Sequence, residues 1–257
     1  MKTSSRTLSE LLAAADAAVV DLDQCIHPRF TQTRCGRGLL AAALRPGSSF
    51  SRLRRCRISL LRGALYIAAQ RAGRLLGAPR PGNEELMEAF ARAIAGVPVS
   101  LLEEISARLP TAGPQDWRKA LGELGERIPV YLLTFSIVPI ARAYGESAWR
   151  NRRIFAGWEG TPLSYLDGRV ESIPIAPGWL TPAGKLAWLE RLLQEKGYRR
   201  PLIIGHGRDE APMARRALEM GGGSVGLRRW GCDGSDFDLL LGCRAWSRLA
   251  AALSPAP

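Results

Sequence analysis

The apolar residues form two different patterns along the chain, and the change falls near residue 113. Before that point they recur every three or four residues, which is typical of helices with one buried face. The segments with this spacing are 39–44, 58–76, 84–94 and 100–109. Prolines and glycines separate these segments at 46–47, 79–82 and 110–114, and Asn83 before two glutamates indicates a helix start. The chain from 30 to 112 is therefore predicted to be all helical.

Elsewhere short apolar runs alternate with helical patterns. A first helix over 8–15, with Thr7 and Glu10 as a capping box, leads to a buried strand over 17–21. Further helices are predicted over 117–127, 138–144, 182–196 and 211–220, strands over 129–133, 201–204 and 237–241, and a small β segment over 162–175. This alternation predicts an α/β fold with a parallel sheet and helices on both faces. The predicted domains are an α/β core (1–29 and 113–250), an inserted α-helical cap (30–112) and a flexible tail (251–257).

Polar residues follow three of the predicted strands. Ligands of open parallel sheets bind beyond the carboxyl ends of the strands, which directs attention to 21–25, 134–136 and 205–210. Asp21 and Asp23 follow the first strand, and such a pair can divide the work of phosphate transfer between a nucleophile and a proton donor. A solvated turn at a strand end is the simpler alternative for the same two residues.

Three further positions suit a phosphate group. Thr134 offers a hydroxyl beside backbone N–H groups, although a helix cap explains it equally well. Lys185, early in its helix, would neutralise charge between a carboxylate and a phosphate, and a surface lysine is the alternative. The segment 203–210 is a strand followed by a glycine-rich turn with ionisable groups, a place to hold a cation or a phosphate.

Taken in order and spacing, these pieces resemble the haloacid dehalogenase (HAD) superfamily, closest to its phosphoserine-phosphatase-like branch, over residues 8–242. The four segments that carry the resemblance are Asp21-Leu22-Asp23-Gln24-Cys25, Leu132-Leu133-Thr134-Phe135-Ser136, Gly184-Lys185, and the stretch from Gly205 to Met213. They are similar to that family's DxDx(T/V), Thr/Ser, Lys and GDxxxD motifs. The resemblance implies a Rossmann-like core with a helical cap.

The resemblance also implies a mechanism. Asp21 would attack the phosphoryl group to form an aspartyl-phosphate, and Asp23 would protonate the leaving group and then activate water. Thr134 and Lys185 would hold the transferring phosphoryl group. The remaining predicted substrate contacts are Ser136, Gly205, Gly207 and Arg208. The predicted metal ligands are Asp21, Asp23, His206, Asp209 and Glu210, with Mg²⁺ as the metal that the family implies.

The fourth motif departs from the family pattern. His206 stands where the first acid is expected, and Glu210 where the last is expected. Mg²⁺ prefers oxygen ligands, so its affinity is predicted to fall; Asp209 or Glu210 would supply an oxygen, or a metal that accepts nitrogen, such as Mn²⁺, would be used. Alternatively, His206 only forms a hydrogen bond in a turn, and the chain is a catalytically impaired phosphate-ligand sensor or interaction module. Cys25 is read as a small half-buried thiol.

The net charge of +12 is unevenly distributed. No acidic residue lies between Asp23 and Glu84, and that stretch holds twelve arginines. Such a block attracts anions, whether a small phosphorylated substrate or an anionic membrane surface, and an arginine-rich solvated surface is the alternative. The block has few aromatic residues and no nucleic-acid motif, which argues against nucleic-acid binding.

Five cysteines without a CxxC pair argue against a disulfide framework or zinc site. The longest apolar stretch, 128–141, is too short to cross a bilayer, and acidic residues interrupt the apolar run near the N-terminus. A cytoplasmic protein, either free or peripheral to a membrane, is expected. The sequence predicts a phosphomonoester hydrolase acting on a small or lipid-linked anionic ester, and it predicts no oligomeric state.

Overall fold

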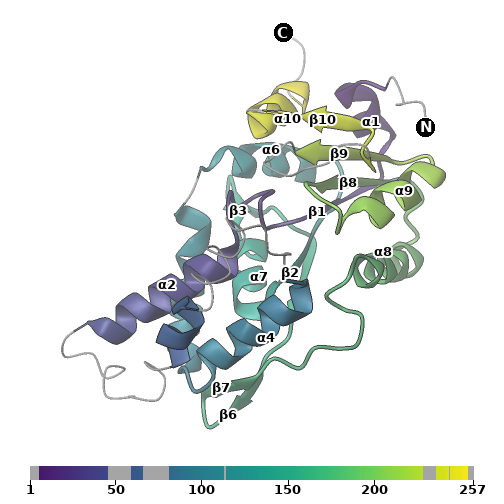
Figure 1. Ribbon diagram of the computed structural model, residues 1–257. Coiled ribbons are helices and arrows are strands. Elements are labelled where there is room, and N and C mark those ends of the chain that lie inside the picture. Colours follow the sequence, from purple (N-terminus) through teal and green to yellow (C-terminus); the bar gives the residue numbers. More distant parts are fainter. Residues whose placement is uncertain are drawn as a thin grey trace.

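A six-stranded, fully parallel sheet forms the centre of the protein (Figure 1). The computed structural model describes residues 6–45, 59–65, 81–112, 114–227, 236–242 and 244–253. The strand order is β10-β9-β8-β1-β2-β5. These strands are β1 (Ala17–Val20), β2 (Val130–Ile137), β5 (Gly157–Thr161), β8 (Pro201–Gly205), β9 (Gly223–Leu227) and β10 (Leu239–Leu241). The predicted α/β fold with a parallel sheet is confirmed.

Strand β1 lies in the interior of the sheet because all four of its side chains are apolar and buried. It pairs with β2 on one side and with β8 on the other, with Val20 level with Leu132 and Ile204. Parallel strands end at the same edge of a sheet, so the residues that follow β1, β2 and β8 meet there.

Helices cover both faces of the sheet, because successive strand side chains point to opposite sides. Val19 packs into a cluster with α8 (Pro182–Lys196) and α9 (Ala211–Glu219). Ala18 and Val20 pack into the larger cluster on the other face. The helices of the α/β core that contribute to it are α1 (Leu8–Ala14), α6 (Asp116–Gly125), α7 (Val138–Gly145) and α10 (Ala245–Leu253), and the cluster continues into the helical block. Helix α1 begins with the predicted Thr7–Glu10 capping box.

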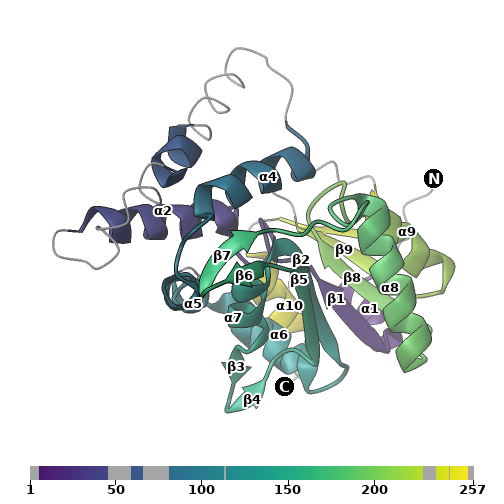
Figure 2. The same ribbon diagram turned by 90° about the horizontal axis from the view of Figure 1, so that it is seen from below.

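The described residues of the helical block (30–45, 59–65 and 81–112) lie toward one end of the strands (Figure 2). Its described helices are α2 (Thr31–Leu44), a helical segment over 59–65, α4 (Asn83–Ile94), α5 (Val99–Ala107) and the 3₁₀ helix η2 (Leu109–Thr111). The hairpin of β6 (Ser164–Leu166) and β7 (Arg169–Ser172) joins this block, since Gly96 donates its N–H to the Val170 carbonyl at 2.7 Å. A second small antiparallel ribbon pairs β3 (Ala148–Trp149) with β4 (Arg152–Arg153).

Several boundaries differ from the expectations. Helix α2 begins eight residues earlier than predicted, because Thr31 and Cys35 supply the buried positions of its first turns, although a threonine and a cysteine do not form an apolar run. The predicted tail is wrong over residues 251–253, which belong to α10, where Leu253 is 2% exposed. Residues 254–257, and 66–76 of one predicted helix, lie outside the described residues.

Five of the twelve arginines between Asp23 and Glu84 fall within the described residues, and all five are exposed: Arg29, Arg34, Arg37, Arg45 and Arg62. The others lie outside the described residues. Among the described helices none is both long and apolar enough to cross a membrane.

Candidate active site

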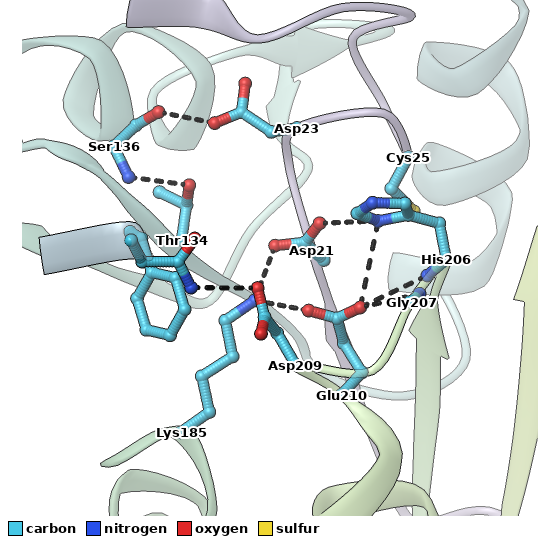
Figure 3. Close-up of polar contacts among 12 residues, drawn as sticks. Asp21, Asp23, Cys25, Thr134, Ser136, Lys185, His206, Gly207, Asp209 and Glu210 are labelled. Atoms are coloured by element: carbon cyan, nitrogen blue, oxygen red, sulfur yellow. Dashed lines mark hydrogen bonds and ion pairs between the residues drawn. The ribbon is translucent and has the colours of Figure 1, made fainter. Parts of the chain in front are cut away.

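A buried cluster of charged side chains lies where β1, β8 and the start of α8 meet (Figure 3). The Nζ atom of Lys185 is 2.8 Å from Asp21 Oδ1 and 2.5 Å from Glu210 Oε1. The side chains of Lys185, Asp21 and Glu210 are only 2%, 5% and 1% exposed. The surface-lysine alternative for Lys185 is therefore excluded.

The first turn of α8 places Lys185 in this cluster. Thr181 caps the helix by accepting the Gly184 N–H at 3.1 Å, and Lys185 follows as the next residue. A side chain at Gly184 would clash with the chain before the helix, because its Cβ would lie 2.3 Å from the Gly178 carbonyl oxygen. Lys185 Nζ also lies 4.5 Å from the centre of the Phe135 ring, a favourable cation–π distance.

Burial and the neighbouring charges shift the pKa values of Asp21, Glu210 and Lys185 in opposite directions. Burial, the largest effect, would raise the pKa of Asp21, but the Lys185 ammonium and His206 together outweigh it and hold that pKa below its usual range. Burial raises the pKa of Glu210 despite the same lysine. Burial disfavours the ammonium, yet the two carboxylates raise the pKa of Lys185 above its ordinary value. Asp21 is therefore ionised beside a permanently charged lysine.

The turn after β8 is built around Glu210. Its Oε2 atom accepts the N–H groups of Gly207 at 3.0 Å and His206 at 3.3 Å. Gly205 permits this fold of the chain, because a Cβ there would come within 2.6 Å of Glu210 Cγ. As a result, the imidazole of His206 is aimed at Asp21, with Nδ1 lying 3.2 Å from Asp21 Oδ2.

Asp21, His206 and Glu210 could hold a metal ion, since one ligand atom from each lies within 4.8 Å of the others. His206 Nδ1 is buried and has no well-aligned hydrogen bond, although it is 3.2 Å from Asp21 Oδ2 and 3.7 Å from Glu210 Oε2. Metal–ligand bonds of about 2.1 Å put tetrahedral neighbours roughly 3.4 Å apart, close to these separations. The donors therefore fit a divalent ion that accepts imidazole. Asp21 raises the pKa of His206 against the effect of burial, so a metal ion would compete with a proton for this imidazole.

Asp23 belongs to a neighbouring network. Its Oδ1 accepts the Thr31 N–H at 2.5 Å, and its Oδ2 accepts the Ser136 hydroxyl at 2.9 Å. Ser136 in turn donates its N–H to Thr134 Oγ1 at 3.0 Å. Burial raises the pKa of Asp23 to about 6, because it outweighs the hydrogen bond from Thr31, and the charge of Asp21 adds to the effect. The pKa values of Asp21 and Asp23, the two carboxylates of the DxD pair, are thus shifted in opposite directions.

The remaining predicted residues are placed differently. Asp209 is outside the three-residue cluster and accepts a hydrogen bond at 3.1 Å from Asn83 Nδ2, at the start of α4. Arg208 is exposed. Cys25 is fully buried, with Sγ 3.8 Å from the Ile204 carbonyl oxygen, more enclosed than the half-buried thiol expected.

Sequence reasoning missed two residues that contact the site from the helical block, Thr31 and Asn83. Each is the first residue of its helix, in α2 and α4 respectively. Asn83 was recognised only as a helix start, whereas Gly82 is the capping position and the Asn83 side chain instead reaches Leu180 and Asp209. The signal available was a hydrogen-bonding side chain at the predicted start of the insertion, Thr31, and at the predicted start of one of its helices, Asn83.

No family model matches the sequence, and no curated protein matches it. Solved structures do resemble it. A phospho-aspartyl intermediate analogue of phosphoserine phosphatase superposes with a TM-score of 0.57 at 13% identity, covering 88% of this chain and 93% of that one. A HAD family hydrolase from Salmonella enterica serovar Typhi gives 0.55 at 12% identity, covering 88% and 67%. Cytosolic 5'-nucleotidase IIIB bound to cytidine gives 0.53 at 10% identity, covering 96% and 89%. The chain therefore has the fold of the HAD-type phosphatases, as the sequence motifs predicted.

Proposed function

We propose that the protein is a phosphomonoester hydrolase in which Asp21 forms an aspartyl-phosphate. One observation carries the proposal: Asp21 is ionised beside the buried Lys185, whereas the pKa of Asp23 is raised to about 6. One carboxylate is thus suited to attack and the other to carry a proton. The similar structures support the same chemistry, since one is an analogue of a phospho-aspartyl intermediate.

In the first step an Asp21 carboxylate oxygen bonds to phosphorus, and the bond from phosphorus to the ester oxygen breaks. Asp23 gives its proton to that departing oxygen. In the second step Asp23 takes a proton from water, whose oxygen attacks the same phosphorus and releases Asp21. The product is inorganic phosphate, and both carboxylates return to their starting states.

Lys185 and Thr134 would stabilise the transferred phosphoryl group. The Lys185 ammonium lies beside the attacking carboxylate, so it lowers the repulsion between Asp21 and an anionic ester. The Thr134 hydroxyl oxygen accepts the Ser136 N–H, which leaves its own proton for a phosphoryl oxygen. Gly205 allows the close turn that organises Glu210, and the Gly207 N–H donates to the Glu210 carboxylate.

Asp21, His206 and Glu210 would hold a divalent metal, which neutralises phosphoryl charge when bound. We propose a metal that accepts nitrogen, such as Mn²⁺, in preference to Mg²⁺, because His206 offers an imidazole. Thermal unfolding should therefore shift upward more with Mn²⁺ than with Mg²⁺. His206→Asp should reverse that order, and equal shifts in both proteins would contradict the assignment.

The substrate that fits best is a small or lipid-linked ester with further negative charge. The helical block, together with the β6–β7 hairpin, would act as a cap over the strand ends and choose it, since this block carries the exposed arginines. A solution assay with small phosphate esters, compared with esters in vesicles, would separate the two kinds of substrate.

The experiment that tests the function uses p-nitrophenyl phosphate with Mg²⁺, Mn²⁺ and Co²⁺, for the wild type and Asp21→Asn. Metal-dependent turnover that Asp21→Asn abolishes is expected. A second candidate is a non-catalytic phosphate binder, favoured by the engagement of Glu210 with Lys185 at 2.5 Å. Equal rates for the two proteins with every metal, together with phosphate binding by calorimetry, would support that candidate instead.

A further inference from the structure

Both carboxylate oxygens of Asp23 are held by two residues from different parts of the protein. Thr31, the first residue of α2, donates its N–H to Oδ1, and Ser136 of β2 donates its hydroxyl to Oδ2. The hydroxyl oxygens of Thr31 and Ser136 lie 2.5 Å apart, and both residues are 0% exposed. Asp23, which is itself partly exposed, is therefore held by two residues that solvent does not reach.

Each hydroxyl group has a single proton, and this decides which group donates in each of these hydrogen bonds. The Ser136 hydroxyl has one proton and gives it to Asp23, so its oxygen accepts the proton of the Thr31 hydroxyl. The Ser136 N–H is already used by Thr134. Ser136 thus has no proton left for a substrate, which contradicts the substrate contact that the sequence suggested for it.

We propose that Ser136 and Thr31 are positioning residues, which hold the Asp23 carboxyl in place for proton transfer to the leaving group. The inference rests on the proposed function, in which Asp23 is the proton donor. It also gives the start of α2 a specific role, because Thr31 connects the helical block to the proton-transfer group of the core. The Thr31 hydroxyl contacts the Ser136 hydroxyl, while the Thr31 backbone N–H donates directly to Asp23.

The test compares two esters that differ in their need for a proton. An alkyl phosphate must receive a proton as its alcohol leaves, whereas p-nitrophenolate leaves without one. The quantity kcat/KM reports the steps through departure of the leaving group. Ser136→Ala should lower it about 30-fold for the alkyl phosphate and about 3-fold for p-nitrophenyl phosphate, a partial loss of the roughly 10²–10⁴-fold that general acid catalysis contributes.

Three further variants make the result specific. Thr31→Val keeps the shape and the N–H but removes the hydroxyl, and should lower kcat/KM about 10-fold for the alkyl phosphate. Thr31→Ser restores the hydroxyl and should stay within about 2-fold of the wild type. Ser224→Ala is the matched control, because Ser224 is a buried serine whose hydroxyl also donates to a carboxylate, that of Asp238, outside the candidate site. Relative to the wild type, the kcat/KM of Ser224→Ala should change by the same factor for both esters.

Equal losses on both esters would overturn the inference and leave only a structural role for Ser136. A raised KM on both esters with unchanged kcat would overturn it in favour of a substrate contact. In either case the wild type and Asp21→Asn would still differ, so the proposed function would stand. If Asp21→Asn matches the wild type, the proposed function itself fails, and the positioning role fails with it.

Discussion

Replacing Lys185 by methionine should destabilise the protein more than any other single change in the cluster. The substitution keeps the length and apolar stem of the side chain but removes the ammonium. Asp21 and Glu210 then face each other with no cation between them, at 5% and 1% exposure, where water screens their charges little. The variant is therefore expected to fold less stably at neutral pH.

The contact distances set the magnitude. Separations of 2.8 Å and 2.5 Å at an effective dielectric constant of about 20 correspond to roughly 6 kcal/mol of attraction for each ion pair. Desolvation of the three charges offsets most of this, and removal of one partner from a buried pair costs about 3–5 kcal/mol. We expect a loss of that size in the free energy of unfolding.

Urea unfolding followed by tryptophan fluorescence measures the loss, with Lys196→Met as the matched control. Lys196 is exposed and lies in the last turn of the same helix, so its replacement should cost under about 1 kcal/mol. If the free energy of unfolding of Lys185→Met lies within about 0.5 kcal/mol of that of the control, the ion pairs of Lys185 do not stabilise the fold as argued.

The pH dependence provides a second check on the same variant. Without Lys185, burial raises the folded-state pKa of Asp21 and Glu210 above the unfolded values. A group with a raised folded pKa contributes stability below its unfolded pKa and loses it as the pH rises. The gap between variant and wild type should thus be largest near neutral pH and narrow as the pH falls toward 4. Adding Glu210→Gln should recover part of the loss, because it removes one of the two facing charges.

Three further outcomes are expected. Because Asp23 must be protonated to act as an acid and its pKa is about 6, kcat/KM for an alkyl phosphate should fall as the pH rises through about 6, and Asp23→Asn should remove that limb of the pH profile. Gly205→Ala should destabilise the protein by about 1–3 kcal/mol, because its Cβ would lie 2.6 Å from Glu210 Cγ. Gly207→Ala is the control, since its Cβ meets nothing closer than 3.9 Å, and equal unfolding midpoints for the two would be the contrary result. Asp209→Asn should leave the thermal shift by Mn²⁺ unchanged, whereas a ligand role would abolish it.

The sequence predicted the sheet where apolar runs were continuous and failed where glycine interrupted them. The runs around β1, β2 and β8 read as buried parallel strands, and each is a strand of the central sheet. Strands β5 and β9 each contain two glycines, which weaken the strand signal, so neither was predicted. They form because neighbouring strands already present unpaired backbone groups, a tertiary effect that no local pattern records.

The candidate site was likewise predicted only in part. Parallel topology predicted that Asp21 and Glu210 would lie close together, because it brings the strand ends to one edge of the sheet, and the family resemblance implied that Lys185 would join them. The sequence could not predict that Thr31 would bond Ser136, 105 residues away, or that Asn83 would bond Asp209. Those contacts depend on how the helical block is placed on the core.

The replacement of an acid by His206 also has a consequence for charge. Asp21 and Glu210 carry two negative charges and Lys185 one positive charge, so the cluster with a neutral His206 is negative by one unit. A bound divalent ion would make it positive by one unit, whereas an aspartate at position 206 would leave it neutral. With His206 the site has one oxygen ligand fewer than with an aspartate, but the metal-bound cluster attracts a phosphate ester more strongly. This exchange fits a site next to the arginine-bearing helical block, where anionic substrates are already favoured.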